Sequence, residues 1–294
     1  MSLSPALAGE RFVVDGISVY SAGQGPPLLL VHSVNAAASA AEVRPLFEHG
    51  CASRTVFAVD LPGYGFSQRT DRAYTSRLMT DALHTVAAHI AKRCGPAPLD
   101  ALAVSLSTEF VARAAVEQPA HWGRLALVSP TGLNGRKSRH GPPGSSRAVP
   151  GLHRVLSQPL WAQALFNALS KPAVVRYFLE RTWGQKNIDE VMCAYAVLTA
   201  RAPGARFAPL HFLSGGMFSA DIHTVYQALQ QPVWMSHGVR GDFTDYKRVD
   251  IVKGRTNWQF SIFQTGALPY FEVPLEFNPA LDLFLAGSAV GSRV

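Results

Sequence analysis

The 294-residue sequence lacks several features that would place it in a specialised class of proteins. It has only three cysteines, Cys51, Cys94 and Cys193, whose odd number and wide spacing fit neither a disulfide framework nor a metal site and favour a reducing cytoplasm. No apolar run approaches the roughly 18 residues of a membrane span, and the N-terminal MSLSPALAGERF lacks the pattern of a secretory signal. Because 48% of the residues are hydrophobic and only 16% are charged, the chain can fold around a large core.

Acidic residues are missing from a long internal stretch. Between Gln118 and Leu179 there is no Asp or Glu, whereas the same stretch carries eight of the 27 basic residues. The net charge of +7 therefore belongs to this stretch, and the rest of the chain is close to neutral. Charge alone would allow binding to nucleic acid, but no nucleic-acid-binding motif accompanies it, so we expect no nucleic-acid partner.

Short apolar segments alternate with helical patterns along the first 130 residues. Turn signals such as Asp15-Gly16 and Gly95-Pro96 separate them. The predicted strands are 11–22 (a hairpin), 28–33, 55–60, 99–104 and 125–128, and the predicted helices are 36–50, 74–93 and 107–117. This alternation predicts an α/β fold whose mostly parallel sheet is covered by helices on both faces.

The alternation stops near residue 131. Residues 131–150 are rich in Gly, Pro, Ser and Arg and are predicted to form a loop, and residues 155–202 are helical with no strand candidate. Alternation then resumes with a helix over 221–230, the strands PVWMSHG and WQFSIF, and a last helix over 275–285. We therefore predict a core formed by residues 1–131 and 221–294, interrupted by an all-helical insert of residues 132–220.

Five motifs resemble, in order and spacing, the landmarks of the α/β-hydrolase fold family. LLLVHS resembles the strand that ends in a His-Gly pair, VDLPGYGFS is similar to the Asp-x-Pro-Gly-x-Gly-x-Ser loop, and VSLSTEF resembles the strand–turn–helix elbow of the nucleophile. PVWMSHGVRGD ends at the place of the acid, and ALPYFEVPLEF resembles the last strand–loop–helix, where the family carries its base. The resemblance implies an α/β-hydrolase core, and the insert looks like the cap or lid of that family.

The resemblance implies that Ser107 is the nucleophile. A serine hydroxyl needs a neighbouring base, and the sharp turn aims backbone N–H groups at the oxyanion that forms. Ser105 supplies the small residue expected two positions earlier, but Glu109 does not supply the one expected two positions later. The alternative is that Ser107 only caps the following helix, with Ser105 or Thr108 as competitors.

The resemblance also implies an oxyanion hole formed by the N–H groups of Thr108 and Val34. The second of these follows His32-Ser33, which lacks the Gly of the family pattern. Asp242, at the end of a strand, would orient the base; the alternative is a loop aspartate that accepts backbone hydrogen bonds.

No histidine follows Asp242, although the family order is Ser, Asp, His. The position of the base falls at Ala267, and Tyr270, with an ordinary pKa near 10, would be a poor base at neutral pH. Three explanations stay open. The chain is a natural variant that lost triad hydrolysis, another group replaces the base, or Ala267 is an engineered inactivating change. The possible replacements are Tyr270, His140, His153 and His211.

The insert combines basic residues over 136–140 with large apolar residues over 152–169. Such a segment could lie on an anionic membrane or admit an acyl or carboxylate substrate, but we favour an apolar stripe that packs on the core. No phosphate-binding glycine loop or ligand-spaced cluster predicts a cofactor or metal. The leading hypothesis is a carboxylic-ester hydrolase with an altered or defective triad, acting on a small apolar or amphiphilic substrate. The alternative is a non-catalytic ligand-binding or scaffold protein that keeps the pocket.

Overall fold

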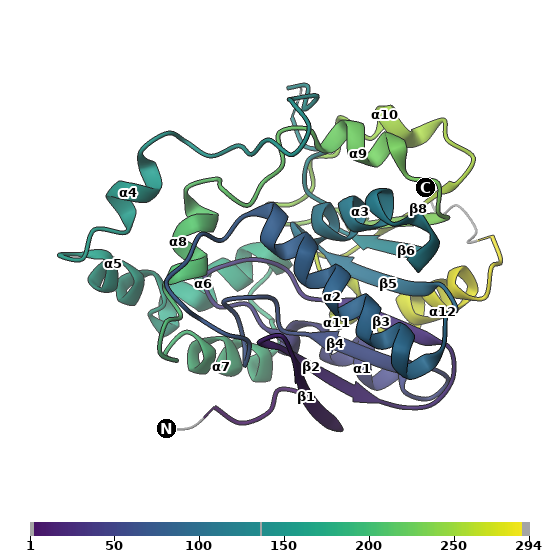
Figure 1. The fold of residues 1–294 in the computed structure, drawn as a ribbon, viewed down its shortest axis with the longest axis horizontal. Coiled ribbons are helices and arrows are strands. Elements are labelled where there is room, and N and C mark those ends of the chain that lie inside the picture. Colours follow the sequence, from purple (N-terminus) through teal and green to yellow (C-terminus); the bar gives the residue numbers. More distant parts are fainter. Residues whose placement is uncertain (1–2, 136, 290–294) are drawn as a thin grey trace.

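A computed structural model describes residues 3–135 and 137–289, and an eight-stranded sheet forms its centre (Figure 1). The strands are β1 (Glu10–Val14), β2 (Ile17–Ala22), β3 (Pro27–Val31), β4 (Thr55–Val59), β5 (Leu99–Val104), β6 (Trp122–Val128), β7 (Val233–Gly238) and β8 (Trp258–Phe263). They lie in the order β1-β2-β4-β3-β5-β6-β7-β8, and the pairs are parallel except β1–β2 and β2–β4. The predicted mostly parallel sheet is confirmed.

Helices cover both faces of this sheet, as predicted. Leu29 and Val31 of β3 belong to the hydrophobic cluster with α2 (Ser76–Cys94), α3 (Ser107–Glu117) and α9 (Ile222–Ala228). Leu28 and Leu30 belong to the opposite cluster, with α1 (Arg44–Gly50) and α12 (Pro274–Leu285). Side chains alternate across a strand, so a strand covered on both faces has a continuous apolar sequence. Four short helices complete the core: η1 (Ala40–Val43), η2 (Pro119–His121), α10 (Asp250–Lys253) and α11 (Pro269–Glu272).

The predicted helix over 36–50 is shorter than expected. Helical structure begins only with η1, at Ala40, and residues 36–39 form an irregular loop. The Asn35 side-chain oxygen accepts a hydrogen bond from Ala37 N–H at 2.7 Å, and Ser39 caps η1. Short polar side chains compete with helical hydrogen bonds in this way, and here they leave the loop free to line a cavity.

The insert contains α4 (Leu152–Leu156), α5 (Ala162–Leu169), α6 (Pro172–Trp183), α7 (Glu190–Thr199) and α8 (Phe207–Leu213), and its described residues contain no strand. In Figure 1, α4 and α5 lie farthest from the sheet. Phe166 is buried, but Val155, Leu160 and Trp161 are exposed. The expectation that the apolar stripe packs on the core is therefore wrong for these three residues. Arg136, which we placed at the start of the insert, lies outside the described residues.

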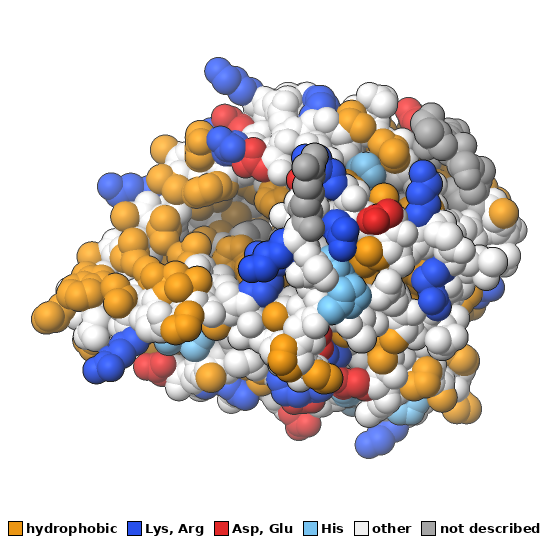
Figure 2. All heavy atoms as spheres, turned by 90° about the horizontal axis from the view of Figure 1, so that it is seen from above, with side chains coloured by type: hydrophobic (Ala, Val, Ile, Leu, Met, Phe, Trp, Pro, Cys, Tyr) orange, Lys and Arg blue, Asp and Glu red, His pale blue; other side chains and the backbone are white. Residues whose placement is uncertain are grey.

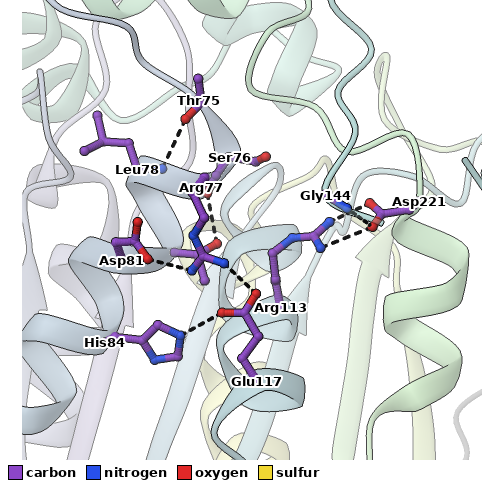
Figure 3. A network of polar contacts seen from close by, with 11 residues as sticks. Thr75, Ser76, Arg77, Leu78, Asp81, His84, Arg113, Glu117, Gly144 and Asp221 are labelled. Carbon is purple, nitrogen blue, oxygen red and sulfur yellow. Dashed lines mark hydrogen bonds and ion pairs between the residues drawn. The ribbon is translucent and has the colours of Figure 1, made fainter. Parts of the chain in front are cut away.

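One buried and one partly exposed ion pair connect α3 to its neighbours (Figure 3). Arg113 of α3 donates to Asp221 at 2.5 Å, and Asp221 also accepts from the N–H of Gly144 at 2.7 Å. One turn further along, at the last residue of α3, Glu117 accepts from Arg77 of α2 at 2.6 Å in a partly exposed pair. A buried pair holds its geometry firmly, because removing one partner leaves the other charge desolvated. The helix that follows β5 is thus held between α2 and the first loop of the insert.

The sequence predicts a cytoplasmic location from its few cysteines and from the lack of a membrane-spanning segment. Cys51, Cys94 and Cys193 are free thiols, and burial raises the pKa of each, which disfavours the reactive thiolate. None of the helices that the structure describes has the length and apolar character needed to cross a membrane. A cytoplasmic location stays a prediction.

Candidate active site

A cavity of about 360 Å³ lies at the carboxyl ends of the parallel strands. The core contributes the loop 33–42 after β3, the turn 104–106 after β5, and short segments after β6, β7 and β8. Helices α5 to α8 contribute mostly apolar side chains, and Figure 2 shows a hollow surrounded by hydrophobic groups. Ligands of α/β folds bind at this edge of the sheet, where loops from several strands meet.

The turn between β5 and α3 holds Ser105 with a φ of +55°. This left-handed conformation is uncommon for a residue with a side chain and marks a strained position. Ser105 N–H donates to Val128 O at 2.9 Å, and Ser105 O accepts from Thr108 N–H at 3.2 Å. Ser105 is half-buried and lines the cavity, while Ala103 and Ser107, two positions to either side, are small and fully buried. The sharp turn therefore presents Ser105, not Ser107.

Ser107 and Thr108 have structural positions. Ser107 does not line the cavity, and its hydroxyl donates to the carbonyl oxygen of His32. The Thr108 N–H is used by Ser105, and its hydroxyl lies 2.9 Å from that of Tyr226. The elbow predicted at Ser107 is thus displaced by two residues. The small residues Ala103 and Ser107 around Ser105 are the sequence signal that identifies the correct position.

Two backbone donors in the cavity wall are unpaired. Val34 and Leu106, the residue after Ser105, line the cavity, whereas Thr108 does not. Neither the N–H group of Val34 nor that of Leu106 has an acceptor among the described residues. The predicted oxyanion role of the Val34 N–H stays a prediction. The loop before Val34 is fixed by Glu42, which accepts from Ser33 N–H at 3.3 Å and Ser33 Oγ at 2.7 Å. Ser33 therefore supplies a side-chain anchor where the family pattern has Gly.

Glu42 is a functional candidate that the sequence analysis missed. Glu42 lines the cavity and is buried. Burial raises its pKa to about 7, although the hydrogen bonds from Ser33 act in the opposite direction. The group can therefore gain or lose a proton near neutral pH. Its position within the predicted helix 36–50 gave no sign of this burial.

Asp242 lines the cavity on the loop after β7, where the sequence places the acid. Its partner is Arg181 of α6. The Arg181 guanidinium donates to both carboxylate oxygens, with Nη2 2.6 Å from Oδ1 and Nε bonded to Oδ2. The Asp242 N–H also donates to the Arg181 carbonyl oxygen at 3.2 Å. The carboxylate is thus bound to the insert.

Comparison with solved structures identifies the architecture. A bacterial membrane phospholipase A is similar with a TM-score of 0.72 and 21% identity, covering 95% of this chain and 86% of that one. A serine hydrolase involved in carbazole degradation has a TM-score of 0.71 and 17% identity, covering 95% of this chain and 99% of that one. A carboxylesterase from Bacillus subtilis has a TM-score of 0.68 and 16% identity, covering 96% of this chain and 93% of that one. This chain has the α/β-hydrolase fold. Neither a protein-family model nor a curated protein matches the sequence.

Ala267, where the sequence resemblance leads us to expect the base, has no titratable side chain. Ala267 lines the cavity, its N–H donates to Thr182 O at 2.9 Å, and its carbonyl accepts from Ser129 Oγ at 2.7 Å. Tyr270 does not line the cavity, and its buried hydroxyl has no partner among the described residues. Burial raises the pKa of Tyr270 well above 10, which keeps it protonated.

No histidine among the described residues lines the cavity. His140 lies 3.0 Å from Thr224, and His153 stacks on His211 beside a separate cavity of about 130 Å³. His32 is buried, accepts from Leu61 N–H at 3.0 Å, and has a pKa lowered to about 4 by burial. Within the described residues, no group of three His, Cys, Asp or Glu side chains could hold a metal ion. Among the described residues that line the cavity, the titratable side chains are those of Glu42 and Asp242.

Proposed function

We propose that this protein is a hydrolase that cleaves carboxylic esters of small apolar or amphiphilic molecules, with Ser105 as its nucleophile. The observation that carries the proposal is the strained turn at Ser105 beside the unpaired N–H groups of Val34 and Leu106. Such a turn exposes the serine hydroxyl, and two backbone donors stabilise the oxyanion that forms when Oγ attacks a carbonyl carbon. The insert, residues 132–220, acts as the cap of this site.

The proton of Ser105 needs an acceptor, and we assign this role to Glu42. Asp242 is held by Arg181 on both carboxylate oxygens, whereas the pKa of Glu42, about 7, suits proton exchange at neutral pH. Glu42 accepts the Ser105 proton, directly or through a water, as the Oγ–carbon bond forms. It returns the proton to the alcohol that leaves, and a water molecule then cleaves the acyl-enzyme.

The walls of the cavity favour an apolar acyl group. Side chains such as Leu179, Met192 and Phe218 line it. Among the described residues that line it, only Glu42, Asp242 and Asn35 have a carboxylate or an amide side chain. Proteins of similar structure include a phospholipase A and a carboxylesterase, which supports an ester as substrate. The fold alone does not fix the reaction, so the bond type must be tested directly.

Hydrolysis of p-nitrophenyl acetate, butyrate and octanoate tests the proposal. We expect measurable turnover by the wild-type chain and a loss of at least roughly 100-fold in kcat/KM for Ser105→Ala. Ser107→Ala is the matched control, because it also removes a hydroxyl from the elbow, and its rate should stay within about threefold of wild type. Equal rates for wild type and Ser105→Ala would exclude Ser105 as the nucleophile.

A non-catalytic ligand-binding protein is the second candidate. It is favoured by Ala267 at the base position and by the binding of Asp242 to Arg181. In that case a fatty acid or alkyl ester would bind in the cavity and be released unchanged, and Ser105→Ala would bind it equally well. Calorimetric titration combined with product analysis separates this candidate from the hydrolase.

A further inference from the structure

An apolar tip projects from the molecule at α4 and α5. It consists of Val149, Val155, Leu160 and Trp161, whose exposed fractions are 55%, 54%, 89% and 45%. Both helices lie at the edge of the molecule, away from the sheet (Figure 1). Exposed apolar residues gathered on one element mark an interaction site more often than scattered ones do.

Trp161 presents its apolar ring rather than its polar edge. The indole N–H donates to the carbonyl oxygen of Val155 at 2.9 Å, so the single donor of the ring is already used. The other four tryptophans of the chain are buried. Trp161 is therefore a natural reporter for anything that covers the tip.

The exposed apolar surface continues to the mouth of the cavity. Phe178, Leu213 and Phe243 line the cavity and are also 55%, 42% and 44% exposed. Figure 2 shows hydrophobic side chains around the hollow and along the projecting side of the molecule. A molecule that leaves an apolar phase at the tip would reach the cavity without crossing a polar surface.

The charge around the tip is mainly positive: Asp71 lines the small cavity beside α4, but Arg206 lines the same cavity. Arg154 and Lys171 flank it, both are exposed, and neither forms an ion pair among the described residues. The chain from Gln118 to Leu179 contains no acidic residue. An apolar surface bordered by unpaired cations complements an anionic bilayer, where apolar side chains enter the interface and cations bind lipid headgroups.

We propose that the apolar tip docks on the surface of an anionic lipid bilayer and orients the mouth of the cavity toward it. The mainly basic border favours lipid over a second copy of this chain, because self-association would bring Arg154 and Lys171 together with their own copies. The proposal goes beyond ester hydrolysis, and docking needs neither Ser105 nor Glu42.

Co-sedimentation with vesicles tests the docking. Wild type and Ser105→Ala are mixed with vesicles of phosphatidylcholine alone or with about 30% phosphatidylglycerol. We expect both chains to bind the anionic vesicles, and Leu160→Glu to bind at least about tenfold more weakly. The matched control is Leu275→Glu, because Leu275 is 91% exposed on α12 and should not contribute. Equal binding by wild type and Leu160→Glu, or no binding by wild type, overturns the proposal.

Tryptophan fluorescence gives a second readout that does not depend on variant stability. Anionic vesicles should shift the emission to shorter wavelength, and lipids brominated near the headgroup should quench it. Trp161→Phe should keep binding but lose the shift. A shift that persists in Trp161→Phe would place the contact elsewhere and contradict the proposal.

The charge requirement and the alternative partner are tested together. Arg154→Glu should weaken binding to anionic vesicles by about tenfold, whereas Lys253→Glu, on α10, should leave it unchanged. Sedimentation velocity without lipid reports self-association. If the wild-type chain forms dimers that Leu160→Glu abolishes, and does not bind vesicles, the tip belongs to a second copy and the lipid proposal fails.

Discussion

The two halves of the cavity wall differ in how much of an α/β-hydrolase site they retain. The half built on β3 and β5 has the strained Ser105 and the unpaired N–H groups of Val34 and Leu106. The half built on β7 and β8 has Ala267 where the resemblance leads us to expect the base, and its Asp242 is bound to Arg181. In the proposed site, the backbone donors and Glu42 thus lie in one half, and the expected positions of the histidine base and of the acid lie in the other.

This difference has a physical basis in what each half requires. The elbow and its donors are backbone features that depend on local turns and on small neighbouring side chains. The base and acid depend on single side chains, which one substitution removes. Because oxyanion donors and binding alone retain part of the rate advantage of a serine hydrolase, and because the proposed base Glu42 lies in the first half, we expect slow turnover without the second half.

Adding a histidine to the half built on β7 and β8 should produce the largest change in activity. Ala267 lines the cavity, so an imidazole at this position has open space in front of it. We expect Ala267→His to raise kcat/KM on p-nitrophenyl butyrate by about tenfold, and by about 100-fold or more when combined with Arg181→Gln, which frees Asp242 to orient the ring. The measurement is the initial rate at pH 7.5 and 8.5.

Ala267→Asn is the control for this gain, because it adds a polar side chain without a base. An equal gain for Asn would show that the added side chain acts through packing or polarity. No gain in the double variant would mean that the retained half does not hold an activatable serine.

Glu42 should make the free energy of unfolding depend on pH. Its pKa is about 7 in the folded protein against an ordinary value of 4.5, so folding favours its protonated form. The contribution of Glu42 to the free energy of unfolding is fully present below about pH 4.5 and is lost as pH rises through about 7. Relative to Glu42→Gln, the wild type should therefore lose on the order of 3 kcal/mol of unfolding free energy between pH 4.5 and pH 8.

Urea unfolding of both chains at pH 4.5, 6 and 8 measures this difference. Asp60 and Glu109 also have pKa values raised by burial, but they are present in both chains and cancel in the comparison. Parallel stability curves for wild type and Glu42→Gln would contradict the assignment. Loss of turnover in Glu42→Gln at every pH would support its role in proton transfer.

Ser107→Ala should have the smallest effect. It removes the hydrogen bond to the buried His32 carbonyl oxygen but keeps a small residue beside the elbow. We expect a loss of about 1 kcal/mol of unfolding free energy with little change in turnover. Thermal unfolding and the butyrate assay measure the two effects, and a loss of activity matching that of Ser105→Ala would return the nucleophile to Ser107.

Much of the fold was predictable from the sequence because its signals are local and repeated. Continuous apolar runs such as 28–31 and 101–104 identified buried parallel strands, and a long helical stretch without strand candidates predicted the insert. The predicted helix over 36–50 began too early, because the alanines of 36–41 favour a helix. The sequence pattern does not show the local hydrogen bonds of Asn35 and Ser39 that form a loop there instead.

The site was predictable only where a motif fixed the position. The Ser-Leu-Ser sequence offers two serines two residues apart, and the backbone conformation of Ser105 decides between them. Arg181 and Asp242 are 61 residues apart, so their ion pair has no sequence signal. The burial of Glu42 likewise depends on the packing of the whole loop around it.

Covalent labelling with a fluorophosphonate tests the central claim most directly. Trypsin releases residues 94–113 as one peptide that contains both Ser105 and Ser107, and fragmentation of the labelled peptide by mass spectrometry locates the modified serine. We predict the label on Ser105 in the wild type and in Ser107→Ala, and no label in Ser105→Ala. A label on Ser107, or an unlabelled wild type under conditions that label a control esterase, would contradict a nucleophile at Ser105.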